Sequence, residues 1–523
     1  MAVARVACRA QLGLAAPLVQ VEVSLASGLP AFCIVGLPAT VIKESKERVR
    51  AALTNSGFTF PAGRITVSLA PAELPKEGGR FDLPIALGIL LASGQLRGRA
   101  QGEERPREFY GELGLTGELK PVRGLLLAAA HARRQGHELV VPCGNASEAC
   151  AAAPSQVRAA SHLLEVCAHL RGVSPLPPHP APGRAATDSD AGTVTRPDLA
   201  DVRGQWLAKR ALVIAAAGAH SLLLIGPPGS GKTMLAHRLP GLLPPLAESE
   251  ALEAAAIAAV STGGFAPEQY GQRPFRAPHH SSSTAALVGG GARALPGEVS
   301  LAHLGVLFLD ELPEFARVAL EALREPLESG SVCVSRAALQ NRYPAAFQLI
   351  AAMNPCPCGR LGDATADCRC TPAQVRGYRG RISAPLLDRL DMQVEVPRLA
   401  AREFTAAASE HVETTAAAAE RVARARAVQL ERQGTCNARL TDAAVQRWCR
   451  ADEVAERLLA NAMERFGLSG RARQRVLKVA RTIADLAGVP VVTAGHIGEA
   501  LRLRCLDERR ATAPSAPCGR PPA

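Results

Sequence analysis

The sequence predicts a multidomain protein of the α/β class, and three observations lead to this expectation. The chain has 523 residues, which is more than one hydrophobic core normally supports. Between residues 199 and 398, helical stretches alternate with short apolar runs that are bounded by turns, as in a parallel sheet. From residue 399 to residue 505, Ala, Glu and Arg recur at helical spacing. We therefore expect a parallel-sheet core that is followed by a helical lid.

The first 171 residues predict a separate, smaller α/β unit. Apolar side chains alternate over residues 19–25 and again over residues 65–69, as in strands that are buried on one face. Residues 81–91 are apolar enough for a buried helix. Residues 172–198 are rich in Pro, Ala and Gly without an apolar period, which predicts a linker, and residues 506–523 predict a flexible tail.

Composition and charge limit the class of protein. Apolar residues make up 47% of the chain and charged residues 21%, as in globular proteins. The formal net charge of +12 favours a polyanionic partner such as DNA. A high arginine content that results from biased base composition of the gene would explain the charge equally well. The most apolar stretch, residues 211–225, is too short to span a bilayer, and no signal-peptide cleavage site follows the N-terminus. We expect a cytoplasmic protein without membrane contacts.

A phosphate-binding loop, residues 226–233, follows the apolar run 222–225 and precedes a helical stretch, which is the context that such a loop requires. We call this segment the P-loop. Its glycines let backbone N–H groups converge on phosphate oxygens, Lys232 can reach the β- and γ-phosphates, and Thr233 can ligate Mg²⁺. We therefore predict that ATP and Mg²⁺ bind to eight consecutive residues: Gly226, Pro227, Pro228, Gly229, Ser230, Gly231, Lys232 and Thr233.

Two later apolar runs end in polar residues that suit ATP hydrolysis. Residues 306–309 are followed by Asp310, a candidate Mg²⁺ ligand, and by Glu311, which can polarise the attacking water. Asn354 follows the run 347–352, where its amide can orient the same water. The alternative for Asn354 is an ordinary turn at the end of a strand.

Phosphoryl transfer also needs cations that oppose the charge developing on the γ-phosphate, and two arginines are candidates. Arg389 is our candidate for an arginine that reaches the nucleotide of a neighbouring subunit, the alternative being surface pairing with Asp388 or Asp391. Arg471 opens a predicted helix of the lid and is a candidate sensor of the nucleotide state, the alternative being a merely exposed basic residue.

Four cysteines form two close pairs that suit a metal ion. Cys356 and Cys358 are followed, after nine residues, by Cys368 and Cys370. Four thiolates at this spacing can hold a tetrahedral Zn²⁺ ion, and the glycines between the pairs allow the loop to fold back. Free thiols and an iron–sulfur cluster are the alternatives. We predict a structural zinc site beside the ATP site.

Two further segments bear on substrate contact. His279 and His280 have no acidic neighbour in sequence and would point apart on a strand, so we expect a loop and no metal pair. The glycines at positions 289–291 then indicate a mobile segment that can touch a substrate in the pore of a ring. Six basic residues of the lid predict a DNA-binding face, with a solvated helix surface as the alternative: Arg465, Arg471, Arg473, Arg475, Lys478 and Arg481.

Several motifs together resemble one family, the Mg-chelatase-like AAA+ proteins of the ComM/YifB type, which are bacterial competence-related proteins. The resemblance covers nearly the whole chain from residue 4 to residue 503, without the linker and the tail. The matching motifs lie at residues 28–32, 34–38, 47–50, 81–88, 275–291, 352–355 and 479–485.

The resemblance implies an ATP hydrolase that forms a hexameric ring and acts as a DNA helicase, migrating branches as single strands are integrated in natural transformation. A chelatase-like or protein-remodelling ATPase is the alternative, disfavoured because the chelatase motor subunit lacks a unit like residues 1–171. Family positions then fall on Lys232 (Walker A), Asp310 and Glu311 (Walker B), Asn354 (sensor 1), Arg389 (arginine finger) and Arg471 (sensor 2).

The N-terminal unit is similar to the Lon protease domain, whose Ser–Lys dyad serves as nucleophile and base. Alignment with the two Lon motifs puts Ile85 at the serine and Leu126 at the lysine. Neither side chain can do this chemistry. We expect a Lon-like fold without peptidase activity.

Overall fold

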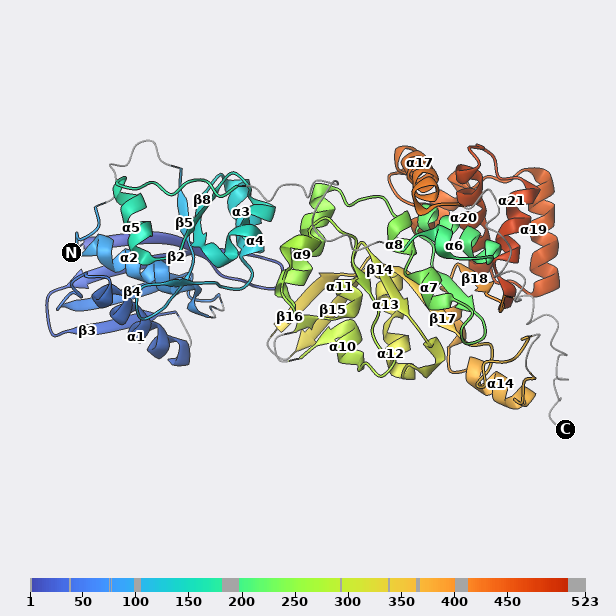
Figure 1. Ribbon diagram of the computed structural model, residues 1–523, viewed down its shortest axis with the longest axis horizontal. Helices are drawn as coiled ribbons and strands as arrows, with labels where there is room; N and C mark the ends of the chain where they lie inside the picture. Colours follow the sequence, from blue (N-terminus) through green and yellow to red (C-terminus); the bar gives the residue numbers. More distant parts are fainter. Residues whose placement is uncertain are drawn as a thin grey trace. The chain divides into compact units, whose positions relative to one another are not determined.

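The computed structural model describes residues 2–36, 39–74, 76, 78–97, 105–180, 197–291, 294–336, 339–363, 367–399 and 413–506. They form two compact units, Met1–Gly192 with Ala247–Gln272, and Thr193–Leu246 with Arg273–Ala523 (Figure 1). Most of the predicted linker and all but the first residue of the predicted tail lie outside the described residues. None of the described helices is both long enough and apolar enough to cross a membrane.

The N-terminal unit contains a mixed seven-stranded sheet in the order β3-β4-β2-β1-β5-β8-β9. Pairs β1–β2 and β2–β4 are antiparallel, and the other pairs are parallel. The strands are β1 (Ala2–Arg9), β2 (Leu18–Ala26), β3 (Ala31–Val35), β4 (Arg64–Ala70), β5 (Arg107–Phe109), β8 (Glu138–Pro142) and β9 (Val157–Ala160). The predicted strands at 19–25 and 65–69 are confirmed within β2 and β4, where alternate apolar side chains are buried.

Helices cover this sheet. The predicted buried helix is α2 (Asp82–Ala92), which packs against β1 and β2 and contains the buried Ile85. Leu126, in α3, is buried as well, so both positions aligned with the Lon dyad hold apolar core side chains. The remaining elements are α1 (Ala39–Asn55), α3 (Leu125–Gln135), α4 (Ala146–Ala152), α5 (Leu163–Arg171) and the short pair β6 (Glu112–Leu113) and β7 (Leu119–Lys120).

Helix α9 (Glu248–Val260) belongs to the N-terminal unit, although the sequence assigns its residues to the core at 199–398. It packs against α3, where Arg133 donates a hydrogen bond of 2.9 Å to Glu248. Its alanine-rich surface allows close packing on either unit, so the sequence pattern alone does not determine which one it joins.

The second unit is built on a five-stranded sheet in the order β11-β14-β17-β10-β18, and every pair in it is parallel. The strands are β11 (Phe275–Arg276), β14 (Val306–Leu309), β17 (Gln348–Met353), β10 (Leu222–Ile225) and β18 (Met392–Glu395). All residues of β10, β14 and β17 are buried, which explains their unbroken apolar sequences. The predicted parallel-sheet core is confirmed.

Short helices and two hairpins surround this sheet (Figure 1). The helices are α6 (Trp206–Gly218), α7 (Lys232–Ala236), α8 (Leu239–Leu242), α10 (Thr284–Val288), α11 (Glu298–Leu301), α12 (Arg317–Ala322), α13 (Arg324–Ser329), α14 (Pro372–Arg379) and α15 (Ala384–Leu387). The hairpins are β12 (Gly289–Gly290) with β13 (Leu295–Pro296), and β15 (Ser331–Arg336) with β16 (Leu339–Pro344).

The predicted helical lid is also present in the second unit. It consists of α17 (Thr415–Gln433), α18 (Asp442–Trp448), α19 (Glu453–Phe466), α20 (Gly470–Leu486) and α21 (Ala494–Arg502). Four of these helices begin after a side chain that accepts a backbone N–H bond, namely Thr414, Thr441, Asp452 and Ser469. Helices α17 and α20 pack against α6, so the lid and the sheet share one hydrophobic core.

Candidate active site

The P-loop connects β10 to α7 at the carboxyl edge of the parallel sheet. Gly229 and Gly231 have φ angles of 76° and 92°, a region that favours glycine. A Cβ atom at Gly226 would lie 2.1 Å from the carbonyl oxygen of Val396, so this position also excludes a side chain. Because β14 and β17 run parallel to β10, their carboxyl ends lie at the same edge. The structure therefore gathers the predicted residues 310, 311 and 354 near the P-loop.

The ammonium group of Lys232 contacts the backbone of the P-loop. It donates hydrogen bonds to the carbonyl oxygens of Gly226 and Pro227 at 2.8 and 2.9 Å, and to Oδ1 of Asn354 at 3.3 Å. Burial lowers the pKa of Lys232, whereas the charges of Asp310 and Glu311 act in the opposite direction. The contact between Lys232 and Asn354 also confirms that Asn354 reaches the P-loop.

The two predicted Mg²⁺ ligands are in direct contact. Thr233 Oγ1 donates a 2.7 Å hydrogen bond to Oδ2 of Asp310. The other carboxylate oxygen of Asp310 accepts the backbone N–H of Glu311 at 2.9 Å, which fixes the orientation of the carboxylate. A hydroxyl and a carboxylate oxygen at this distance suit Mg²⁺, which binds one or two protein oxygens and completes its shell with water and phosphate. The donor set therefore fits ATP with Mg²⁺.

Glu311 is held in an unusual backbone conformation and contacts a histidine. Its φ angle is 53°, in the left-handed region, and its side chain is about half exposed. His280 Nδ1 lies 3.2 Å from Oε2 of Glu311, and the rings of His279 and His280 are 4.0 Å apart. The predicted loop at His279 and His280 is confirmed, but the expectation that no acidic partner lies nearby is wrong. Strand β11 ends at Arg276, so they lie in a loop, and the neighbouring strand β14 supplies the carboxylate.

Tyr378, in α14, is a residue of this site that the sequence did not indicate. It is buried, and the pKa of its hydroxyl is raised to about 12, first by burial and then by the charge of Glu314. A hydrogen bond with the backbone of Asn354 acts in the opposite direction. Tyr378 therefore supports the segment that carries Asn354. A tyrosine 24 residues further along the chain carries no signal that links it to a strand end.

The four predicted cysteine ligands lie together. The Sγ atom of Cys356 is 3.4 Å from that of Cys358 and 3.7 Å from that of Cys368, and all four sulfurs lie within 4.8 Å of one another. A tetrahedral zinc ion with Zn–S bonds of about 2.3 Å holds its sulfurs about 3.8 Å apart. The backbone N–H of Leu361 also points to Cys356 Sγ at 3.4 Å, a contact that favours a thiolate. The donor set fits zinc.

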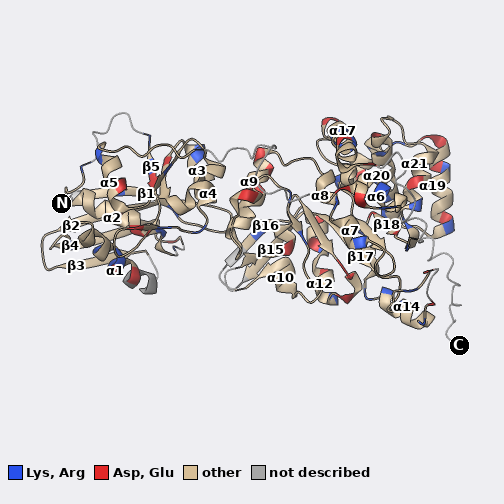
Figure 2. Cartoon of the chain, viewed as in Figure 1, with Lys and Arg blue, Asp and Glu red and all other residues tan. Residues whose placement is uncertain are grey.

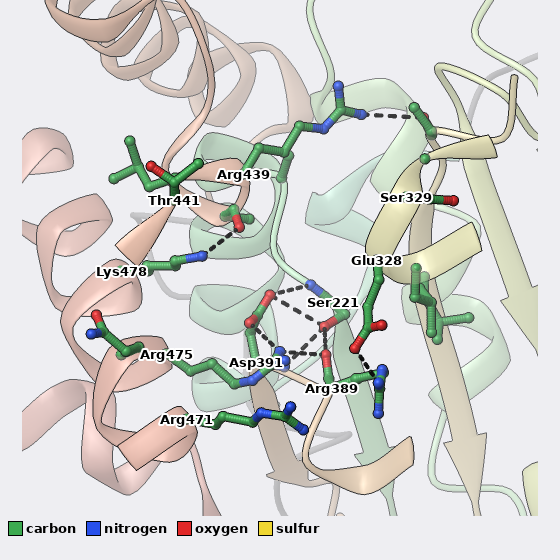
Figure 3. Close-up of a pocket in the computed structure, with 18 of the residues that line it drawn as sticks. Ser221, Glu328, Ser329, Arg389, Asp391, Arg439, Thr441, Arg471, Arg475 and Lys478 are labelled. Atoms are coloured by element: carbon green, nitrogen blue, oxygen red, sulfur yellow. Dashed lines mark hydrogen bonds and ion pairs between the residues drawn. The ribbon is translucent and has the colours of Figure 1, made fainter. Parts of the chain in front are cut away.

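Arg389 and Arg471 line one pocket of about 880 Å³, shown in Figure 3. Ser221, Phe347 and Asp391 also line it, and each directly precedes a strand of the sheet. The pocket thus lies at the amino edge, and the P-loop lies at the carboxyl edge. The four residues of β10 alone separate the two edges by about 13 Å. The structure brings the two arginines together but away from the P-loop of the same chain.

The contacts of Arg389 differ from the two surface pairs that we considered, with Asp388 and with Asp391. Its guanidinium pairs with Glu328 and donates a 2.7 Å hydrogen bond to the carbonyl oxygen of Pro385. Asp391 pairs instead with Arg475. Among the described residues, the buried Nε of Arg389 has no hydrogen-bond partner. This guanidinium therefore has donor capacity that no residue in the described part of the chain uses.

The six basic residues of the lid do not form one exposed face. Arg481 is buried and pairs with Asp485, Arg475 pairs with Asp391, and Arg473 pairs with Glu456. Figure 2 shows both acidic and basic positions on α19, so this part of the lid carries mixed charge. The prediction of a basic face is wrong. Arginines recur along α20, but some of them point into the core and others point outward.

Three family models match successive parts of the chain. The model described as "Magnesium chelatase, subunit ChlI" matches residues 198–404, "Subunit ChlI of Mg-chelatase" matches residues 21–145, and "Magnesium chelatase, subunit ChlI C-terminal" matches residues 412–504. The second match lies in the N-terminal unit and carries a chelatase description. We expected that this unit would distinguish the chain from chelatase subunits. The match shows that its presence does not do so.

Curated bacterial proteins are similar to this chain over almost their full length. Competence protein ComM of Haemophilus influenzae is 47% identical over 506 residues, which cover 97% of this chain and 98% of the relative. The uncharacterized protein YifB of Escherichia coli is 47% identical over 508 residues, with the same coverage. The uncharacterized protein Rv2897c of Mycobacterium tuberculosis is 43% identical over 524 residues, which cover 98% of this chain and 100% of the relative. The similarity includes both units.

Proposed function

This chain belongs to the ComM/YifB family of magnesium chelatase-like ATPases, and on that premise we propose that it is a DNA motor driven by ATP hydrolysis. In this proposal a ring of six subunits unwinds or migrates branched DNA while incoming single strands are integrated during natural transformation. The observation that carries the proposal is the assembled P-loop edge, where Lys232 contacts Asn354 and Thr233 contacts Asp310.

The hydrolytic step follows from this geometry. Lys232 and the backbone of the P-loop bind the phosphates, while Thr233 and Asp310 hold Mg²⁺. Bound Mg²⁺ neutralises the charge on the β- and γ-phosphates. Glu311 accepts a proton from the attacking water, and the Asn354 amide orients that water. Lys232 and Thr233 begin α7 after the P-loop, whereas Asp310, Glu311 and Asn354 directly follow β14 or β17.

The placement of the two arginines supports a ring. Arg389 and Arg471 line a pocket at the amino edge of the sheet, whereas the P-loop of the same chain lies at the carboxyl edge. A ring is built from head-to-tail contacts between two different surfaces of the subunit, and we propose that these surfaces are the amino edge of one sheet and the carboxyl edge of the next. Both arginines then approach the γ-phosphate held by a neighbour. This places Arg471 in the same trans position as Arg389, where it senses the neighbour's nucleotide.

DNA is the proposed substrate for two reasons. The chain carries a formal net charge of +12, which favours a polyanion, and one of its relatives at 47% identity is named a competence protein. In this proposal the N-terminal unit has a Lon-like fold and serves as an assembly or substrate-binding platform. The apolar, buried Ile85 and Leu126 support the absence of peptidase activity. A reducing cytoplasm suits the four cysteines as thiolate ligands of a structural zinc ion.

The ATPase rate with and without DNA tests this proposal. We expect single-stranded and forked DNA to raise the rate, the effect to weaken from low to moderate salt, and Lys232→Ala to abolish hydrolysis under all conditions. The salt dependence arises because Lys and Arg release counterions from the DNA backbone. A rate that no DNA changes would contradict the DNA motor, and normal hydrolysis by Lys232→Ala would contradict the P-loop assignment.

A chelatase-like function is the second candidate, and a specific finding favours it. All three matching family models carry magnesium chelatase descriptions, including the one that matches the N-terminal unit. In that case a protein partner, and not DNA, would stimulate hydrolysis. The same ATPase assay distinguishes the two functions, since a chelatase-like or protein-remodelling ATPase would not respond to forked DNA.

A further inference from the structure

The four-cysteine loop packs on the P-loop at Gly359. Gly359 follows Cys358, and a Cβ atom at this position would lie 2.6 Å from Cδ and 2.8 Å from Cγ of Pro228. The φ angle of Gly359 is 77°, which also favours glycine. The backbone of the cysteine loop is thus packed directly on the second proline of the P-loop, with no room for a side chain.

The same loop begins at the end of the strand that carries Asn354. Cys356 is two residues further on and is fully buried. Between them, the carbonyl oxygen of Pro355 accepts two hydrogen bonds of 3.2 Å from the guanidinium of Arg379, in α14. The N–H of Gly359 donates to the carbonyl oxygen of Cys356 at 3.0 Å, which closes a tight turn. The segment from Asn354 to Gly359 is therefore held by α14 on one side and meets Pro228 on the other.

We propose that the four-cysteine centre is a positioning element of the nucleotide site, and that metal bound there sets the affinity of the P-loop for ATP. This inference rests on the proposed ATPase function. A metal ion that joins both cysteine pairs holds the loop closed, so that Gly359 stays against Pro228 and Asn354 stays within reach of Lys232. Without a cation, thiolates whose sulfurs lie within 4.8 Å of one another repel, and neutral thiols are joined only by weak Sγ contacts.

The proposal concerns binding and not the chemical step. A metal-bound loop reduces the number of conformations that the P-loop must give up when the nucleotide binds, and a preorganised site binds more tightly. The expected readout is therefore the dissociation constant of a fluorescent, non-hydrolysable ATP analogue. The zinc content of each protein, determined by metal analysis, is the second readout.

Two glycines of the same loop provide a matched pair of variants. Gly359 and Gly362 have φ angles of 77° and 80°, so alanine meets similar backbone strain at both. They differ in their surroundings, because a Cβ atom at Gly362 would meet nothing within 4 Å. We expect Gly359→Ala to keep its zinc and bind the analogue about tenfold more weakly, since overpacking of this kind displaces the P-loop. Gly362→Ala should keep both zinc and wild-type affinity.

A rescue experiment assigns the effect to the contact with Pro228. Pro228→Ala removes both atoms that a side chain at residue 359 would meet. In the Pro228→Ala background, Gly359→Ala should therefore weaken binding by much less than it does in the wild-type background. An equal loss in both backgrounds would contradict the proposed route through Pro228.

Removal of the metal gives an independent test on the full chain. We expect the wild-type protein to contain one zinc ion per chain and to bind the analogue more weakly after chelation, with recovery when zinc is returned. Equal affinity before and after chelation, or wild-type affinity in Gly359→Ala, would overturn the proposal. These results are distinct from failure of the ATPase function, in which the zinc-loaded wild-type protein would bind no nucleotide at all.

Discussion

Asp391 is the residue for which the structure predicts the clearest effect on stability. Its carboxylate accepts hydrogen bonds from the backbone N–H and the hydroxyl of Ser221 at 3.0 and 3.2 Å. It pairs with Arg475 at 3.0 Å (Figure 3), and His220 Nδ1 lies 3.4 Å from the same carboxylate. Arg475 also donates to the carbonyl oxygen of Arg389 at 2.6 Å. This network joins α20 of the lid to the amino ends of β10 and β18.

The perturbation is Asp391→Asn, which keeps the shape of the side chain and removes its charge. Breaking a buried ion pair by removing one partner costs about 3–5 kcal/mol. The side chain of Arg475 remains 21% exposed, so we take the lower end, about 3 kcal/mol. That is a large share of the stability of a typical domain, about 5–15 kcal/mol. The matched control is Asp388→Asn, in a residue that lines the same pocket.

Urea unfolding followed by tryptophan fluorescence measures this change. The chain has two tryptophans, and both Trp206 and Trp448 belong to the second unit, so the signal reports that unit alone. For a urea dependence of about 3 kcal/mol per M, a loss of 3 kcal/mol lowers the midpoint by about 1 M. A midpoint for Asp391→Asn equal to that of Asp388→Asn would refute the reasoning.

The effect should also depend on pH. Burial alone would raise the pKa of Asp391, but His220 and the charge of Arg475 lower it below its ordinary value. A carboxyl group with a lowered pKa in the folded state stabilises the fold above its unfolded pKa of about 3.9, and this stability is lost as the pH falls through the folded pKa. The difference between wild type and Asp391→Asn should therefore be full at pH 7 and shrink below about pH 4.

Two further predictions concern catalysis. Arg389→Ala should lower kcat about 10³-fold or more if the arginine acts on a neighbour's γ-phosphate, and mixing these subunits with equally inactive Glu311→Gln subunits should restore ATPase activity; no recovery on mixing, together with normal rates for Arg389→Ala alone, would exclude the trans role. His280→Ala should lower kcat by about 1.4- to fivefold with little change in KM, because the exposed contact with Glu311 is worth about 0.2–1 kcal/mol. His279→Ala is its control, and an unchanged kcat in His280→Ala would show that the contact does not orient Glu311.

The sequence predicted which candidate residues lie together where their placement depends on local context. A phosphate loop between a strand and a helix, and carboxylates at the end of an apolar run, carry their chemistry in a few adjacent positions. The contact of Asn354 with Lys232 was also predictable, because parallel strands end at a common edge. The same reasoning failed for His280, since its partner Glu311 comes from a separate strand 31 residues away.

By itself, the sequence determined the parallel-sheet core, the helical lid, the P-loop with its candidate Mg²⁺ ligands, and the four cysteines as one set. Spacing and hydrophobic period are enough for these features because each is encoded within a short segment. Only the tertiary structure decided that α9 joins the N-terminal unit and that Arg389 and Arg471 share a pocket away from the P-loop. It also placed Gly359 on Pro228. These relations join residues far apart in the chain, and they depend on strand order and on packing surfaces that no local pattern encodes.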